Sequence, residues 1–113
     1  IHPLKTAAEN PMSSDLMKIM INDYSGWHWL NSNPHKPSPE GTIELMNQIK
    51  PPTLIVAGEL SHPVLKDLVS AQSKYIPNSK LVMIENSNHM LNIENPDQFN
   101  KELETFLIEN KIQ

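Results

Sequence analysis

Residues 53–58 read TLIVAG, a short continuous apolar run that lies between Pro51-Pro52 and Glu59. A run of this kind is typical of a strand that is buried on both faces of a parallel sheet. A second run, KLVMIE at 80–85, follows a helical stretch that begins near Pro63. Two strands joined by a helix run parallel to one another. This part of the chain therefore predicts an α/β layered fold.

One helix is predicted after each of these strands. In the last one, Asn95 is a candidate N-cap, Pro96 is the first helical residue and Gln98 can complete a capping box. Its apolar residues recur at helical spacing to about residue 110: Phe99, Leu103, Phe106 and Leu107. The helix near Pro63 has one apolar side, which we expect to be buried: Val64, Leu65, Leu68, Ala71 and Tyr75.

Residues 1–50 give weaker signals. No periodicity is clear in 1–11, and Ser13 or Ser14 can cap a helix through 15–24. The apolar residues of that helix form one face: Leu16, Ile19, Met20 and Tyr24. The Pro-rich stretch 31–41 predicts an extended loop, and 42–49 predicts a short helix. We therefore expect two parts, a helical segment with a Pro-rich loop over 1–50 and a strand–helix–strand–helix unit over 51–113.

The composition excludes several classes of function. The nine cations are all lysines against 13 acidic residues, for a net charge of −4. A nucleic-acid-binding protein normally carries a basic stripe with arginines, so no nucleic-acid partner is expected. The chain has no cysteine, and its histidines lack metal-ligand spacing, so we expect neither a metal nor another cofactor. Apolar runs such as 54–57 are far too short for a membrane span, and no secretory signal is present. We expect a cytoplasmic protein, with a composition that favours a bacterial source.

The two expected strands do not make a satisfactory sheet by themselves. Both edges of such a sheet are apolar and unpaired. The chain of 113 residues also begins at Ile1 and not at Met. We therefore expect further strands to come from an upstream part of the same protein, from a separate polypeptide or from a second copy of the chain.

Polar residues gather where the two strands end. The first strand leads into GELSH at 58–62, and the second leads into NSNHM at 86–90. Ligands of open parallel sheets bind at the carboxyl ends of the strands. His89 lies at such an end, and the ordinary pKa of histidine suits a general base near neutral pH. The alternative is a loop histidine without a chemical role.

The two stretches that surround these ends resemble a known family. They read IKPPTLIVAGELSHP at 49–63 and IPNSKLVMIENSNHMLNIENPDQFNKELETFL at 76–107. The sequence is similar to the C-terminal part of the α/β-hydrolase superfamily, where a strand ends near G-E-x-D. There, I-P-x-(A/S)-x-L, a second strand, a (G/S)-x-G-H loop and E-x-P-x-x-F follow. The resemblance covers about residues 49–108. It implies a three-layer, parallel-sheet α/β-hydrolase fold, represented here only by its C-terminal part, with 1–50 as the rear of a cap or lid.

The resemblance also implies a Ser–acid–His mechanism for hydrolysis of an ester, a thioester or a C–C bond. His89 matches the catalytic histidine, and Asn88 replaces the usual glycine before it. Ser61 stands where the pattern most often has the catalytic Asp, and a hydroxyl cannot supply the charge that stabilises imidazolium. Glu59 is the candidate replacement, and an acid on an earlier strand outside this chain is the alternative. For Ser61 we favour a role in capping the helix near Pro63.

The nucleophile of the expected mechanism is missing. None of the three glycines, Gly26, Gly41 and Gly58, belongs to a G-x-S-x-G motif. The chain alone is therefore not expected to be an active hydrolase. If upstream residues complete the site, a small-molecule substrate is expected, and Trp27, Trp29 and Met90 are candidates for its apolar walls. Trp27 and Trp29 can instead form a packing cluster. The alternative function is a non-catalytic, hydrolase-like binding or interaction module, including a domain-swapped homo-oligomer.

Overall fold

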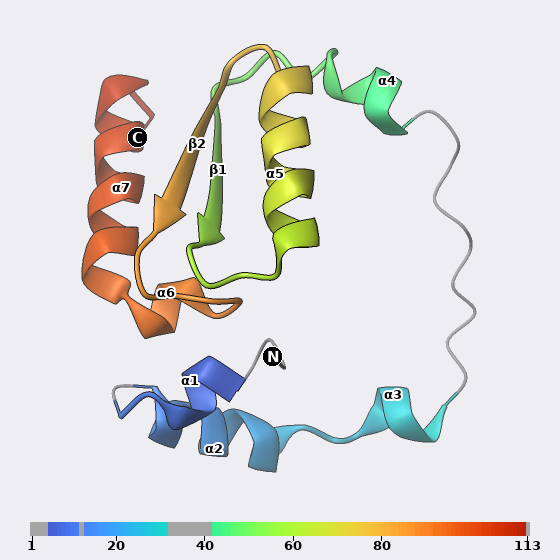
Figure 1. The fold of residues 1–113 in the computed structure, drawn as a ribbon, viewed down its shortest axis with the longest axis vertical. Helices are drawn as coiled ribbons and strands as arrows, with labels where there is room; N and C mark the ends of the chain where they lie inside the picture. The colour runs from blue at the N-terminus through green and yellow to red at the C-terminus, as the bar shows by residue number, and fades with distance from the viewer. Residues whose placement is uncertain (1–4, 12, 32–41, 113) are drawn as a thin grey trace.

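The computed structural model describes residues 5–11, 13–31 and 42–112 of the chain. Short helices occupy the first half, and a strand–helix–strand unit with two further helices occupies the second (Figure 1). The elements are α1 (Lys5–Glu9), α2 (Ser14–Asp23), α3 (Trp27–Leu30), α4 (Thr42–Met46), β1 (Thr53–Gly58), α5 (Pro63–Tyr75), β2 (Ser79–Ile84), α6 (Leu91–Glu94) and α7 (Pro96–Glu109). The predicted α/β class is confirmed, and the predicted loop at 31–41 lies almost wholly outside the described residues.

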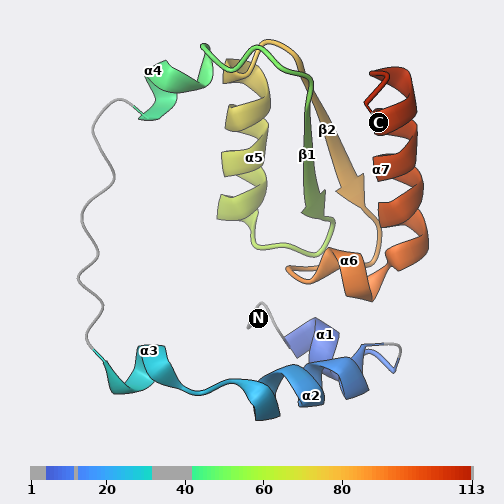
Figure 2. The ribbon, with the colours of Figure 1, turned by 180° about the vertical axis from the view of Figure 1, so that it is seen from behind.

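The sheet is parallel, as the crossover helix predicts. Strands β1 and β2 pair in a register that runs from Thr53 opposite Ser79 to Gly58 opposite Ile84. Within the described residues the sheet has two strands, in the order β1-β2. Helices α5 and α7 flank the strands on opposite sides (Figures 1 and 2). In the part of the chain that the structure describes, no strand pairs with the outer edge of β1, which could accept another strand.

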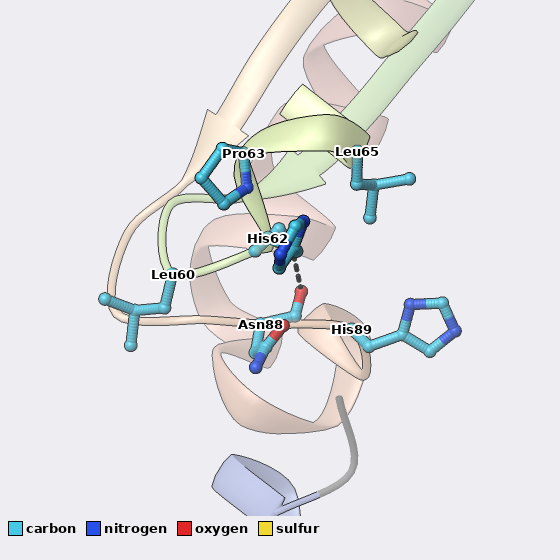
Figure 3. Close-up of a pocket in the computed structure, with 7 residues that line it drawn as sticks. Leu60, His62, Pro63, Leu65, Asn88 and His89 are labelled. Atoms are coloured by element: carbon cyan, nitrogen blue, oxygen red, sulfur yellow. Dashed lines mark hydrogen bonds between the residues drawn. The ribbon is translucent and has the colours of Figure 1, made fainter. Parts of the chain in front are cut away.

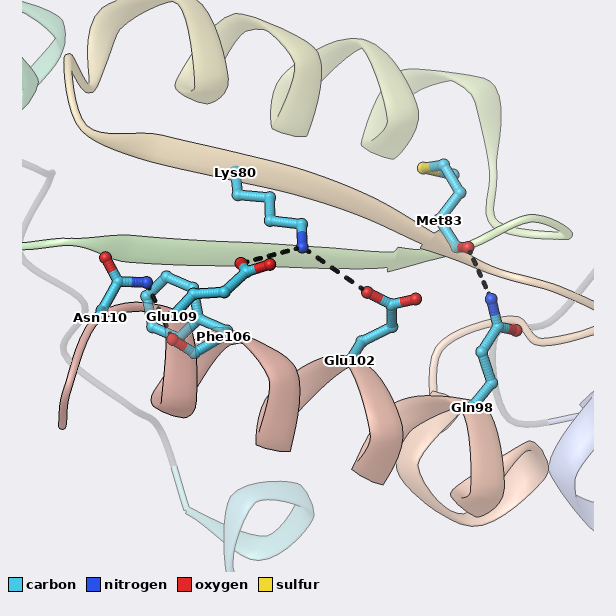
Figure 4. A network of polar contacts seen from close by, with 7 residues as sticks. All are labelled: Lys80, Met83, Gln98, Glu102, Phe106, Glu109 and Asn110. Atoms are coloured by element: carbon cyan, nitrogen blue, oxygen red, sulfur yellow. Dashed lines mark hydrogen bonds and ion pairs between the residues drawn. The ribbon is translucent and has the colours of Figure 1, made fainter. Parts of the chain in front are cut away.

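Each face of the sheet packs against one helix. Ile55 and Ala57 of β1 form the core with Val69 of α5 and with Ile76, the residue directly after this helix. Leu81 and Met83 of β2 pack against them. Alternate residues of a strand point to opposite faces. The other face of β2 accordingly meets α7, where the Lys80 ammonium lies 3.6 Å from a carboxylate oxygen of Glu109 and 4.0 Å from one of Glu102 (Figure 4).

The side of α5 that we expected to be buried is largely exposed. Val64, Leu68 and Tyr75 are exposed, and Leu65 is only partly buried, whereas Val69 is buried. The periodicity identified an apolar side, but the helix turns a neighbouring side toward the sheet. Which side of a helix is buried depends on the strands that it meets, and these contacts are not encoded in the helix itself.

Helices α1, α2 and α3 lie beyond the carboxyl ends of the strands (Figures 1 and 2). Helix α1 contacts α6, and the side-chain amide of Asn10 donates to the main-chain oxygen of Glu94 at 3.4 Å. Ser13 stands at the N-cap position of α2, but its hydroxyl makes no capping bond and donates to the main-chain oxygen of Ala7 at 2.6 Å. The predicted capping role of Ser13 is therefore wrong: its hydroxyl joins α1 to α2.

The apolar face predicted for α2 points outward. The four residues of this face are 44–58% exposed: Leu16, Ile19, Met20 and Tyr24. The buried residue of the helix is Met17. None of the described helices has the length and apolar character that a membrane span requires.

Candidate functional site

The loops that leave β1 and β2 lie side by side at the carboxyl ends of the strands. The main-chain N–H of Glu59 donates to the oxygen of Ile84, and that of Leu60 donates to the oxygen of Ser87, both at 2.8 Å. Gly58 permits this close approach, because a Cβ atom at this position would overlap the carbonyl oxygens of Ser87 and Asn88. The sheet register and a glycine thus bring the loop of His89 against the loop of Ser61.

Asn88, the residue before His89, is held through its main chain from two sides. The hydroxyl of Ser61 donates to its carbonyl oxygen at 3.1 Å. A carboxylate oxygen of Glu94 accepts from its N–H at 2.8 Å. The side chains of Ser61, Asn88 and Glu94 belong to residues that are only 3%, 5% and 6% exposed. The main chain beside His89 is therefore fixed in the interior.

His89 itself is exposed and lies at the rim of a pocket (Figure 3). This pocket, which we call the His89 pocket, has a volume of about 430 Å³. Its lining comes from both loops and from the start of α5: Leu60, Ser61, His62, Pro63, Leu65, Asn88 and His89. A smaller hollow of about 200 Å³ adjoins it along the end of β1 and shares Ser61, Asn88 and His89. An exposed imidazole beside an apolar pocket is suited to proton transfer at a bound small molecule.

The comparisons with known proteins agree on one relationship. No family model matches the chain. Protein ABHD14A of Rattus norvegicus is 33% identical over 64 residues, which are 57% of this chain and 26% of that protein. The structure of MenH from S. aureus matches 98% of this chain with a TM-score of 0.75 and 24% identity, and the match covers 42% of the MenH chain. The chain is related to the α/β-hydrolases. It spans about a quarter of ABHD14A and less than half of MenH.

Glu59, the acid proposed for this hydrolase-related chain, is engaged elsewhere. Its carboxylate accepts from the main-chain N–H of Asn86 at 3.1 Å. Asn86 has a φ of 52°, a left-handed conformation that asparagine tolerates better than most residues. Among the described residues, no hydrogen bond or ion pair joins Glu59 to His89. The observed contact of Glu59 stabilises the turn after β2.

We expected Ser61 to cap α5, and this prediction is wrong. His62 is the N-cap residue, and its Nδ1 atom accepts from the N–H of Val64 at 3.3 Å. Ser61 is buried one residue earlier, where its hydroxyl faces the loop of His89 and bonds Asn88. The serine at the position of the acid in the hydrolase pattern thus joins the two loops.

Two of the three candidates for substrate walls, Trp27 and Met90, do not line the His89 pocket. Trp27 is half exposed on α3, and α3 lies at the end of α2 remote from α1 (Figures 1 and 2). The side chain of Trp29 is outside the described part of the chain. Met90 is partly buried and follows His89 directly, but the residues that line the pocket do not include it.

Sequence reasoning missed Glu94 as part of this site. The signal was available, because Glu94 is the first residue of the E-x-P-x-x-F pattern and follows His89 by five residues. Its importance lies in a bond to Asn88 across a loop and a short helix, α6, that the sequence did not predict. Among the described residues, no group of three or more histidine and acidic side chains is placed to hold a metal ion.

Proposed function

We propose that this chain supplies the catalytic histidine, His89, of a Ser–acid–His hydrolase that cleaves an ester, a thioester or a C–C bond. The observation that supports this most is the exposed imidazole beside the His89 pocket, on a main chain that buried bonds hold in place. The relationship to the α/β-hydrolases supports the same chemistry.

In this proposal His89 moves a proton twice. As a serine supplied from outside this chain attacks the substrate carbonyl, His89 accepts the hydroxyl proton and a C–O bond forms. Collapse of the tetrahedral adduct breaks the bond to the leaving group, which takes the proton from His89. A water molecule then repeats the cycle: His89 accepts its proton as the water oxygen bonds to the acyl carbon. The acyl–serine bond then breaks, the serine oxygen takes the proton from His89 and the carboxylic acid leaves.

The acid is the open part of the mechanism. Glu59 remains our candidate, and one oxygen of its carboxylate already accepts from the main-chain N–H of Asn86. An acid from the completing segment is the alternative. Met90 and the tryptophans Trp27 and Trp29 are proposed as apolar walls that reach the substrate only in the completed protein.

The completing segment must bring a nucleophile and at least one strand. We propose that it is the N-terminal part of the same protein and that it pairs with the outer edge of β1, which is free among the described residues. The match to only 42% of the MenH chain supports a need for such a segment. Self-association through the same edge is the other arrangement.

Native mass spectrometry with a serine-directed fluorophosphonate probe tests this function. We expect a companion polypeptide of about 100–200 residues to accompany the 12.8-kDa chain and to take up the probe. His89→Ala should lower labelling by about a thousandfold, because loss of a triad member typically costs this much or more. Asn92→Ala, an exposed change three residues away, is the matched control and should leave labelling unchanged.

The alternative is a non-catalytic binding or interaction module. Ser61 in place of an acid, and Glu59 bonded to Asn86, favour this alternative. It predicts only 12.8-kDa chains or their multiples in the native spectrum and no labelling by the probe. Multiples would identify self-association of the sheet edges, including domain swapping.

A further inference from the structure

We propose that Ser61 and Glu94 are positioning residues that together fix the main chain of Asn88, the residue directly before His89. We call their two hydrogen bonds to Asn88 the Asn88 clamp. The inference rests on the proposed function of His89, because only then does the position of this main chain matter for chemistry. Ser61, which stands where the hydrolase pattern has an acid, thereby has a structural role in holding the loop of His89.

The burial of Glu94 is the strongest support for the clamp. This residue is 94% buried, since only 6% of its surface is exposed, and one carboxylate oxygen accepts from the Asn88 N–H at 2.8 Å. The other oxygen, Oε1, is buried and has no hydrogen-bond partner among the described residues. A carboxylate buried with one unmatched oxygen opposes folding, so an ordinary packing role does not explain it. The charge-assisted bond to Asn88 is the interaction that this side chain provides.

Ser61 completes the clamp from the opposite loop. Its buried hydroxyl donates to the Asn88 carbonyl oxygen at 3.1 Å, and this carbonyl belongs to the same peptide group as the nitrogen of His89. An ionised aspartate has no donor and cannot make this bond. The chain therefore has, in place of the acid, a side chain that can hold the histidine loop.

The clamp separates a fixed main chain from a free side chain. The N–H and the carbonyl of Asn88 are both bonded in the interior, whereas the imidazole of His89 is exposed at the rim of the pocket. Helix α6, which carries Glu94, is also tied to the N-terminal helices, because Asn10 donates to the Glu94 carbonyl at 3.4 Å. The main-chain position from which the His89 imidazole extends is thus set before any substrate enters the pocket.

Amide hydrogen exchange and ¹⁵N relaxation of the full 113-residue chain test the clamp. We expect the Asn88 amide to be protected, and Glu94→Ala to lower its protection by about tenfold or more while strand amides such as that of Val56 stay protected. Glu94→Gln should restore most of the protection, because an amide oxygen still accepts. It should also move the Asn88 proton resonance upfield, because the bond is no longer charge-assisted.

Ser61→Ala should leave the Asn88 amide bonded but increase the motion of the His89 amide. The double variant Ser61→Ala/Glu94→Ala should increase the motion of the His89 amide further. Two matched controls should leave residues 88 and 89 unchanged. Ser79→Ala removes a hydroxyl that donates to main-chain carbonyls at the other end of β2, and Glu104→Gln changes an exposed acid on α7.

Three results would overturn the inference. The first is an unprotected Asn88 amide in the wild-type chain. The second is an equal loss of protection at Asn88 and in the strands of Glu94→Ala, and the third is a failure of Glu94→Gln to restore protection of the Asn88 amide. None of these depends on a nucleophile. Absence of probe labelling alongside an intact clamp would instead reject the proposed hydrolase function and leave the clamp standing as a structural finding.

Discussion

The carboxylate of Glu59 accepts a hydrogen bond from the main-chain N–H of Asn86 at 3.1 Å. This bond connects the end of β1 to the turn after β2, a separation of 27 residues along the chain. The side chain proposed as the catalytic acid thus has a structural role that can be measured independently of catalysis.

Glu59→Ala should lower the free energy of unfolding by about 0.5–1.5 kcal/mol, because it removes one exposed hydrogen bond to a carboxylate. Glu59→Gln should cost less, since the amide oxygen can accept from Asn86. Urea denaturation of the chain measures both, with Glu104→Gln as the exposed control. A Glu59→Gln variant that is fully stable and yet loses probe labelling in the completed protein would identify Glu59 as the acid.

Gly58→Ala should destabilise the chain by roughly 1–3 kcal/mol and displace the loop of His89, because the added methyl overlaps the carbonyl oxygens of Ser87 and Asn88. Thermal unfolding and the amide resonances of residues 87–89 measure the two effects. Gly26→Ala is the matched control. Its Cβ would meet no atom within 4 Å, but its φ of 69° is left-handed, so it should cost about 1 kcal/mol without disturbing residues 87–89. A loop that stays in place in Gly58→Ala would contradict the close approach.

Asn95→Ala should cost about 1–2 kcal/mol, the usual loss for an N-cap with additional bonds. The Asn95 side chain accepts from the N–H of Gln98 at 3.3 Å and donates to the Glu85 carbonyl at 3.1 Å. Asn95→Asp keeps the acceptor but loses the donor, so its stability should lie between those of the wild type and Asn95→Ala. Equal stability of the aspartate variant and the wild type would show that the bond to Glu85 contributes nothing.

Lys80→Met should change stability by less than about 0.5 kcal/mol, because partly exposed ion pairs at 3.6 and 4.0 Å contribute little. The methionine retains the apolar stem that packs between β2 and α7 (Figure 4). Urea denaturation at low and high salt measures the change. A loss that is large at low salt and absent at high salt would show that the pairs with Glu102 and Glu109 are stronger than this geometry indicates.

The elements that the sequence predicts well are those with local signals. The apolar run at 53–58 is β1, and Pro63 and Pro96 begin α5 and α7. Asn95 caps α7, as a side-chain acceptor directly before a helix predicts. These signals depend only on residues that are neighbours along the chain, so they can be read from a single sequence.

The errors concern contacts between distant residues. Gln98 does not close a capping box. Its side chain accepts from the Glu85 N–H at 2.8 Å. It also donates to the Met83 carbonyl at 3.4 Å (Figure 4). Ser61 bonds Asn88 instead of capping α5, and Glu94 reaches the same residue from α6. A polar side chain bonds whichever main-chain group the fold brings near it. Here the pairing of β1 with β2 determines which main-chain groups lie near these side chains.

Ser61→Asp tests whether the position can still hold an acid. At neutral pH the carboxylate replaces a donor with an acceptor beside the Asn88 carbonyl, at a position only 3% exposed, so stability should fall by about 1–3 kcal/mol. Burial beside a carbonyl oxygen raises the pKa of such an aspartate in the folded chain above its unfolded value. The penalty should therefore shrink as the pH falls, since the protonated carboxyl can donate, and grow as the pH rises through the raised pKa. Urea denaturation at several pH values measures it, with Ser61→Ala as the pH-independent control. If Ser61→Asp were instead more stable than Ser61→Ala at neutral pH, with shifted His89 imidazole resonances, the new carboxylate would have paired with His89. The geometry of a Ser–acid–His site would then have survived the loss of its acid.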